Sequence, residues 1–147
     1  MRATGITRPM NAPTGVQMSA ALDGLTTTLT HGPSSFQLKT VPPKDNGGDG
    51  SSFSPTDLVG AALAACAVTT MALVAKKEGL DFRGATARVE KQMVGPPRRI
   101  GALPLEITMP AATKPEHRAR LEEIARTCPV ALSLHPELHK PMVFRYG

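Results

Sequence analysis

The sequence predicts an α+β domain with a mainly antiparallel sheet and a long central helix, in the order β-β-β-α-β-β-α-β. Short β-favouring runs, separated by turn residues, lie on both sides of a long apolar segment. That segment has helix-start and helix-stop signals at its two ends. A second, shorter amphipathic pattern lies near the C-terminus. The 147 residues are enough for one buried core, and we expect a single domain over residues 16–147.

The N-terminal part should contain a loose arm followed by a small antiparallel meander. Residues 1–15 are mostly polar or small and carry Pro9 and Pro13. Asp23-Gly24 and a His-Gly-Pro step mark tight turns between β-favouring runs. The predicted strands are 16–22, 25–30 and 35–39. A loop without large apolar side chains, 42–50, follows them as a solvated connector or as the border of a pocket.

The long helix has start and stop signals that agree. Ser54 can cap it, with Pro55 at the first helical position and Asp57 three residues after the cap. Lysines occupy the predicted last turn, and Gly79 follows as the stop. Residues 58–75 carry no charge and have nearly the length of a membrane span, but most are small. We therefore expect a buried central helix and no membrane association.

The rest of the chain completes the predicted order. Thr113-Lys-Pro-Glu116 has the pattern of a capping box, and Leu121, Ile124 and Ala125 form the apolar stripe of the helix that follows it. That helix should end at Cys128-Pro129, and a short helical piece can continue through Leu134. The remaining predicted elements are a strand over 82–94, a turn over 95–99, a strand over 100–109 and a last strand over 141–146.

Composition argues against a nucleic-acid-binding protein and against a secreted, disulfide-rich protein. The net charge is +5, but lysines and arginines are scattered among acidic residues and form no stripe. Four phenylalanines and one tyrosine are too few for a base-stacking platform, so no nucleic-acid binding is expected. The N-terminal residues lack the apolar stretch of a signal peptide, and two cysteines do not form a disulfide-rich framework. The expected compartment is the cytoplasm.

Cys66 and Cys128 carry the most informative chemistry of the chain. Two such thiols can form a structural disulfide, half a metal site, two inert core thiols, or the attacking and resolving pair of a redox enzyme. A thiol reacts as thiolate, and Cys66 lies too far inside its helix for the N-terminal dipole to stabilise that anion. A nearby cation is then expected. The candidates are Arg8, Arg98, Arg99 and Arg126, with Arg8 and Arg99 first.

Helical geometry and spacing exclude other partners of the thiols. Asp57 points to the opposite side of the helix from Cys66, which makes it a capping residue. Thr56 is closer in direction, but it lies about 15 Å away along the axis, so any contact with the thiol would have to go through an intermediary or a partner subunit. His31 and His117 look like surface residues, and His135 and His139 do not give a zinc spacing with Cys128. No metal or cofactor is expected.

Several segments resemble the OsmC and organic hydroperoxide resistance superfamily of thiol peroxidases. The shared features are a Gly-Gly step before Ser54-Pro-Thr-Asp-Leu58, then Ala61-Ala-Leu-Ala-Ala-Cys66, then Gly79 closing the helix, and Arg120 to Val130 with its Cys-Pro-Val end. The resemblance covers about residues 16–146.

The resemblance implies an intertwined homodimer with the two long helices at its centre. It also implies a peroxidatic Cys66 that attacks an organic hydroperoxide and a resolving Cys128 that forms a disulfide with it. A dithiol or lipoyl-type reductant would then restore the thiols in this antioxidant, oxidative stress reaction. The alternative is a non-catalytic dimer of the same fold that binds a small apolar ligand at the subunit interface.

The chain departs from the family pattern at one position. The characterised peroxidases have a glutamate ten residues before the first cysteine, paired with an arginine from the early strands. Thr56 occupies that position here, and the predicted early strands contain no arginine. The chain therefore resembles the less characterised OsmC-like branch, and a surrogate cation such as Arg8 or Arg99 would have to hold the Cys66 thiolate.

Overall fold

The structure is a computed structural model that describes residues 15–147. The chain divides into two compact units, residues 1–52 and residues 53–147, and each is described by itself. Arg8 and most of the expected N-terminal arm lie outside the described residues. The expectation of one domain over 16–147 stays a prediction.

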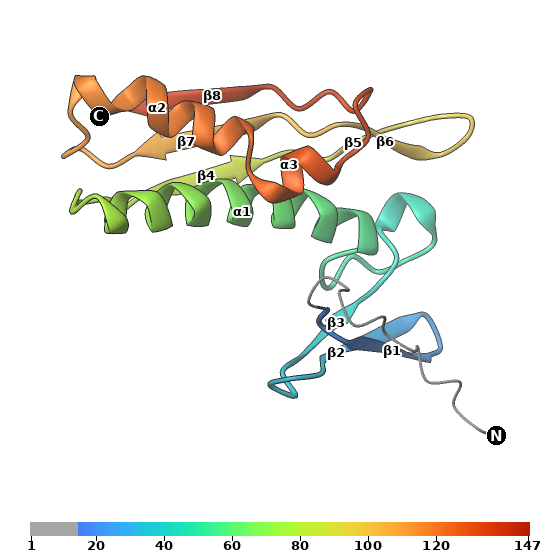
Figure 1. Ribbon diagram of the computed structural model, residues 1–147. Coiled ribbons are helices and arrows are strands. Elements are labelled where there is room, and N and C mark those ends of the chain that lie inside the picture. The colour runs from blue at the N-terminus through green and yellow to red at the C-terminus, as the bar shows by residue number, and fades with distance from the viewer. Residues whose placement is uncertain (1–14) are drawn as a thin grey trace. The chain divides into compact units, whose positions relative to one another are not determined.

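The first unit contains the predicted antiparallel meander. Its strands are β1 (Met18–Asp23), β2 (Thr26–His31) and β3 (Gln37–Thr40), with β2 in the centre (Figure 1). Asp23 pairs with Thr26 at the end of a two-residue turn in which Gly24 has a φ of 62°. Only glycine adopts that backbone conformation at little cost. A 3₁₀ turn, η1 (Lys44–Asn46), follows in the polar loop.

The second unit is built on α1 (Pro55–Lys77). Ser54 accepts a hydrogen bond from the Asp57 N–H at 3.1 Å, and the Asp57 carboxylate accepts one from the Ser54 N–H at 2.8 Å. The predicted capping box is confirmed. At the other end, Gly79 has a φ of 68° and the Leu80 N–H donates to the Ala75 carbonyl at 2.8 Å, which closes the helix as expected.

Two helices and five strands follow α1 in the second unit. They are β4 (Thr86–Val89), β5 (Gln92–Val94), β6 (Arg99–Ala102), β7 (Leu105–Met109), α2 (Pro115–Arg126), α3 (Pro129–Ser133) and β8 (Met142–Tyr146). One sheet has the order β4-β7-β8, and β5 pairs with β6 in a separate hairpin. β7 and β8 are parallel, and all other pairs are antiparallel, so the predicted α+β class with mainly antiparallel pairing is confirmed.

The predictions of single strands over 82–94 and 100–109 were wrong, because each range contains a break. The first begins with a turn in which Asp81 binds the Arg83 guanidinium, and only then do β4 and β5 follow. The second is interrupted before Pro104, which has no N–H for a sheet ladder.

The capping box predicted at Thr113–Glu116 was also wrong. Lys114 is the N-cap of α2, and no side chain caps that helix. The Thr113 hydroxyl is buried without a hydrogen-bond partner among the described residues. The sequence predicted a helix start close to the observed one. The N-cap is Lys114, however, one residue after Thr113, so the Thr113 hydroxyl does not cap the helix.

The core of the second unit lies between α1 and the β4-β7-β8 sheet, with α2 and α3 packed on α1 (Figure 1). Only one stripe of α1 is buried: Gly60, Leu63, Ala67, Met71 and Ala75. A Cβ at Gly60 would lie 3.3 Å from a Leu103 methyl group, so glycine permits the close approach of α1 to the strand region. Leu73, on another face of α1, is 56% exposed in the single chain.

By length and composition, α1 is long and apolar enough to cross a membrane. Length and composition alone do not distinguish a membrane span from the core helix of a globular protein. Here the buried stripe of α1 packs in the main hydrophobic core.

Candidate functional site

The two cysteines meet in the core of the second unit. Cys66 lies in the middle of α1 and is half-buried, whereas Cys128 immediately precedes α3 and is fully buried. Both are free thiols in the same core cluster, and they lie close enough for each to shift the pKa of the other. An attacking and a resolving thiol, one of the four arrangements that the sequence left open beside a structural disulfide, half a metal site and two inert core thiols, need such proximity.

The environment of Cys66 favours its thiolate. Partial burial acts to raise its pKa, but hydrogen bonds from the Val130 N–H, the Thr70 hydroxyl and the Cys128 thiol outweigh that effect. The pKa of Cys66 is therefore lowered from the ordinary value for a thiol. Since a thiolate is the nucleophilic form, we expect Cys66 to be the more reactive of the two cysteines.

Cys128 has the opposite tendency. Burial raises its pKa, and the neighbouring Cys66 raises it further, because a thiolate at Cys66 accepts the Cys128 proton as a hydrogen bond and repels a second negative charge. The N–H groups of Ala131 and Val130 oppose this shift without overcoming it. The pair is thus asymmetric: the Cys66 thiol loses its proton more readily than an ordinary thiol, and the Cys128 thiol less readily.

The Cys-Pro-Val sequence explains how these N–H groups reach the sulfurs. A residue before proline is disfavoured in the helical conformation, and Cys128 is extended with a φ of −63° and a ψ of 155°. Pro129 then starts α3 at the position where its missing N–H is tolerated. The next two N–H groups, those of Val130 and Ala131, have no carbonyl partner within such a short helix and hydrogen-bond the thiols instead.

Thr70 also contacts the Cys66 thiol. Its hydroxyl oxygen lies 3.7 Å from the Cys66 sulfur and 2.7 Å from the Cys66 carbonyl oxygen, to which it donates. Since a hydroxyl has one proton, the protonated Cys66 thiol donates to Thr70 in this arrangement. When Cys66 ionises, the Thr70 hydroxyl can turn from the carbonyl to the sulfur.

Thr56, at the family's glutamate position, belongs to a separate polar cluster at the start of α1. Its hydroxyl accepts a hydrogen bond from Lys91 Nζ at 3.0 Å and lies 3.1 Å from the Ser54 hydroxyl. Lys91 Nζ also forms an ion pair with Asp57 at 2.8 Å. This cluster holds the first turn of α1, and none of its members is among the groups that shift the pKa of Cys66.

The arginines named from the sequence lie at different places. The Arg99 guanidinium donates to the Pro97 carbonyl at 2.9 Å and is exposed at the start of β6. Arg126 lies over the Phe144 ring, 5.0 Å from its centroid, and contacts the Glu122 carboxylate. Arg98 is exposed in the turn between β5 and β6. The role of Arg99 at the thiolate stays a prediction.

A cavity of about 570 Å³ lies between α1, the β5–β6 hairpin and the segment after α3. Val59, Ile100, Leu134 and Leu138 provide apolar walls, and Arg99 is at its border. Val59 is two helical turns before Cys66 on the same face of α1. The cavity therefore offers space for an apolar molecule on the side of the helix that carries the thiol.

Within residues 15–147, no group of three or more histidine, cysteine or acidic side chains is arranged to hold a metal ion. His135 accepts a hydrogen bond from the Glu137 N–H at 3.1 Å, and the His31 ring contacts the Ser34 hydroxyl at 2.6 Å.

Sequence reasoning missed three groups around the functional residues. Thr70 lies four residues after Cys66, a helical spacing that could have revealed it. The Val130 N–H is a backbone group, and its direction depends on how α3 folds back onto α1. Lys91 comes from the segment between β4 and β5, and no local pattern connects it with Thr56.

Comparison with known proteins agrees with this arrangement. No curated protein sequence is significantly similar to the chain. A Psychrobacter arcticus protein described as osmotic stress induced and as a detoxification response protein has a structure with 32% identity and a TM-score of 0.84, covering 92% of this chain and 99% of its own.

Two more distant structures share the fold. An organic hydroperoxide resistance protein OsmC from Legionella pneumophila has 17% identity and a TM-score of 0.73, over 92% of this chain and 99% of its own. The organic hydroperoxide resistance protein OhrB of Bacillus subtilis has 16% identity and a TM-score of 0.64, over 90% of this chain and 98% of its own. The family model for OsmC-like proteins matches residues 48–139, which include both cysteines. With this match and the similarity to the Psychrobacter protein, the chain belongs to the OsmC-like family, which is associated with hydroperoxide resistance and redox chemistry.

Proposed function

We propose that the protein is a thiol peroxidase that reduces organic hydroperoxides, with Cys66 as the peroxidatic and Cys128 as the resolving cysteine. The observation that carries the proposal is the asymmetry of two neighbouring thiols. Cys66 is partly exposed and its pKa is lowered, whereas Cys128 is buried and its pKa is raised. An attacking thiol needs access and ionisation, and a resolving thiol needs proximity to the first.

The reaction has two steps at these sulfurs. The Cys66 thiolate attacks the distal oxygen of the hydroperoxide, so that an S–O bond forms, the O–O bond breaks and the leaving alkoxide takes a proton to become an alcohol. Cys66 is then a sulfenic acid. The Cys128 sulfur attacks it, a disulfide forms and water leaves. A dithiol reductant, for which a lipoyl-type molecule is a candidate, returns two electrons and two protons through thiol–disulfide exchange.

The cavity at Val59, about 10 Å along α1 from Cys66, supports an organic substrate over hydrogen peroxide. Its walls of Val59, Ile100 and Leu134 suit an alkyl or aryl group, whose burial is favourable by about 25 cal/mol per Å² of apolar surface. Of the two arginines that the sequence put first, Arg99 is the one within the described residues, and its place at the cavity border makes it our candidate for a cation near the peroxide.

The proposal includes a homodimer in the cytoplasm. α1 buries only one stripe of residues in the single chain, and Leu73 is exposed on another face. An apolar helix face of this kind is normally covered by protein. Two free thiols suit a reducing compartment.

The test measures consumption of cumene hydroperoxide with a dithiol in excess. Wild type should turn over, Cys66→Ser should consume none, and Cys128→Ser should stop at sulfenic acid after one equivalent, detectable with a sulfenic-acid probe. If wild type consumes no hydroperoxide with either a monothiol or a dithiol, the peroxidase proposal is wrong, and the non-catalytic alternative, a dimer that binds a small apolar ligand, takes its place.

A further inference from the structure

A stripe of charged side chains on α2 faces two aromatic rings of β8. Arg118, Glu122 and Arg126 follow one another at intervals of four residues, so they lie along one side of the helix. Phe144 and Tyr146 lie on one face of β8, because alternate residues of a strand point to the same side. We call these five side chains the α2–β8 ladder.

The contacts within the ladder are directional. The Tyr146 hydroxyl donates to the Glu122 carboxylate at 2.5 Å, and the Arg118 guanidinium lies over the Tyr146 ring, 4.0 Å from its centroid. The Arg126 guanidinium lies over the Phe144 ring, 5.0 Å from its centroid, and its Nη2 is 3.5 Å from the same carboxylate. Hydrogen bonds and cation–π contacts depend on angle and position, so together they fix how far α2 lies along β8.

The central hydrogen bond of the ladder persists over a wide range of pH. Burial raises the pKa of Tyr146, and the neighbouring Glu122 carboxylate raises it further, although Arg118 and Arg126 act against this. The hydroxyl therefore stays a donor at neutral and moderately alkaline pH. The Glu122 side chain is only 22% exposed, so the bond is largely shielded from water.

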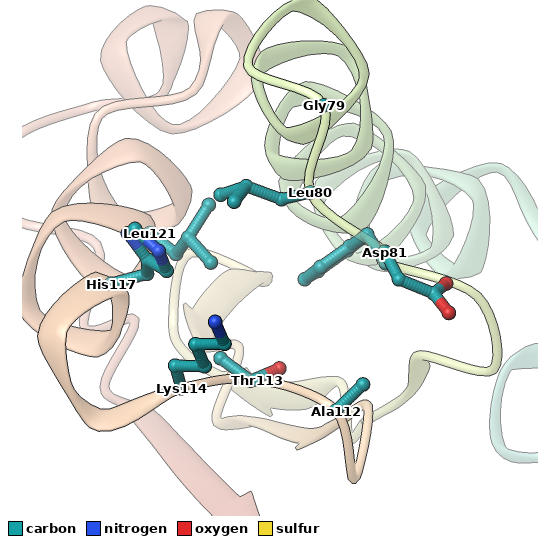
Figure 2. Close-up of a pocket in the computed structure, with 9 residues that line it drawn as sticks. Gly79, Leu80, Asp81, Ala112, Thr113, Lys114, His117 and Leu121 are labelled. Atoms are coloured by element: carbon teal, nitrogen blue, oxygen red, sulfur yellow. The ribbon is translucent and has the colours of Figure 1, made fainter.

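The apolar side of α2 leaves open space. It faces α1, and a cavity of about 260 Å³ lies between the start of α2 and the end of α1. Leu80, Phe82 and Leu121 are among its walls, and Figure 2 shows the Leu80 and Leu121 side chains pointing toward one another. Apolar contacts have no preferred direction, and the space beside them leaves room for α2 to shift. The ladder is therefore the contact that can fix the position of this helix.

Cys128 is joined to both α2 and α3. Its N–H donates to the Ala125 carbonyl in the last turn of α2 at 3.3 Å, and its carbonyl accepts from the Leu132 N–H in α3 at 3.0 Å. α3 also carries the Val130 N–H, which hydrogen-bonds the Cys66 sulfur. A shift of the end of α2 along β8 therefore moves both the Cys128 thiol and this N–H relative to Cys66, and a displacement of about 1 Å is enough to slow a reaction strongly.

We propose that Glu122 is a positioning residue of the thiol pair. Through the α2–β8 ladder it holds the end of α2, and with it Cys128 and the Val130 N–H, at the place where both serve Cys66. Glu122 acts in this role through α2 and not as a charge on the thiolate. The inference deepens the peroxidase proposal, on which the resolving role of Cys128 rests.

The first test follows alkylation of Cys66 by iodoacetamide over a pH series, with Cys128 retained and peptide mapping to distinguish the two cysteines. Glu122→Ala should slow alkylation at neutral pH by at least about threefold, because the thiolate loses well-placed hydrogen-bond donors. Glu122→Gln keeps an oxygen that accepts from Tyr146, so it should alkylate nearly as fast as wild type. Glu123→Ala removes an exposed carboxylate from the same turn of α2 and should leave the rate unchanged.

The direction of the change separates positioning from electrostatics. Removing a negative charge would by itself favour the Cys66 thiolate and speed alkylation, equally in Glu122→Ala and Glu122→Gln. Tyr146→Phe keeps the ring under Arg118, so it should fold, and it should slow alkylation as Glu122→Ala does; it decides the question if Glu122→Ala does not fold. The proposal is wrong if the folded variants alkylate like wild type or faster, or if Glu122→Gln is as slow as Glu122→Ala.

The second test distinguishes this proposal from the peroxidase proposal. After one equivalent of cumene hydroperoxide, the sulfenic acid of Glu122→Ala should convert to the disulfide at least about tenfold more slowly than that of wild type, because Cys128 is displaced. Glu122→Gln and Glu123→Ala should convert it at nearly the wild-type rate, and an unchanged rate in Glu122→Ala overturns the positioning role. If wild type consumes no hydroperoxide, the peroxidase proposal fails, and the alkylation profiles alone decide whether Glu122 positions the two thiols.

Discussion

Replacing Thr70 by valine should make Cys66 less reactive without unfolding the protein. Valine has nearly the shape of threonine but no hydroxyl, so the 3.7 Å contact with the sulfur is lost while packing is retained. A hydrogen bond to a charged group contributes about 1.5–3 kcal/mol. Here the thiolate gains only part of this, because Thr70 must release its 2.7 Å bond to the Cys66 carbonyl in order to donate to the sulfur.

If about half of that energy reaches the thiolate, the loss is about 0.8–1.5 kcal/mol, and the thiolate fraction at neutral pH falls by about four- to twelvefold. Second-order alkylation of Cys66 by iodoacetamide, followed over a pH series in the Cys128→Ser background, measures this fraction. Thr70→Val should slow alkylation at neutral pH by that factor and reach the same plateau at high pH.

Thr70→Ser is the matched control, because it keeps the hydroxyl and should alkylate nearly as fast as its parent. The melting temperature of Thr70→Val should change little, since a hydroxyl bonded to the carbonyl four residues earlier in a helix contributes little stability. An unchanged pH profile in Thr70→Val would refute the role given to this hydroxyl, and so would an equal loss in Thr70→Ser.

Three further predictions concern other parts of the molecule. Lys91→Met should lower the free energy of unfolding by about 1–3 kcal/mol in urea titrations, because Lys91 is 14% exposed and Asp57 loses its ion pair. Partial burial opposes the ionisation of Asp57, but its bonds to Lys91 and Ser54 lower its pKa, so the ion pair stabilises the fold above the ordinary pKa of aspartate. The difference between Lys91→Met and wild type should therefore shrink below about pH 4, and a difference independent of pH would contradict the pairing. Arg99→Gln should slow the reaction with cumene hydroperoxide while leaving the melting temperature unchanged, and an unaltered rate would remove Arg99 as the surrogate cation. Sedimentation at micromolar concentration should show a dimer, and a stable folded monomer would contradict the covered-helix argument made from Leu73.

The sequence was most informative where local rules act alone. Ser54 and Asp57 form the capping box that their spacing predicts, and Gly79 closes α1 in the left-handed conformation expected of a helix stop. These signals involve residues within one turn of each other, so their geometry follows from the helix itself. The antiparallel meander around Gly24 was predictable for the same reason.

Predictions that depend on tertiary context were less successful. The Thr113 pattern matches a capping box, but α2 begins after Lys114 and the hydroxyl stays unpaired. The prediction that Cys66 needs a cation overlooked backbone donors, because the direction of the Val130 N–H depends on how α3 folds against α1. Spacing also could not show that the two thiols lie close together, since that proximity depends on the packing of α3 on α1.

The most direct test of the central claim is the fate of the two thiols after one equivalent of cumene hydroperoxide. Peptide mapping by mass spectrometry should find Cys66 linked to Cys128 within the same chain, with the loss of two hydrogen atoms, and a dithiol should restore both thiols. The same treatment of Cys128→Ser should leave Cys66 heavier by one oxygen atom. If both thiols remain free and alkylatable after excess hydroperoxide, the proximity of Cys66 and Cys128 has no redox role and the proposed peroxidase function is contradicted.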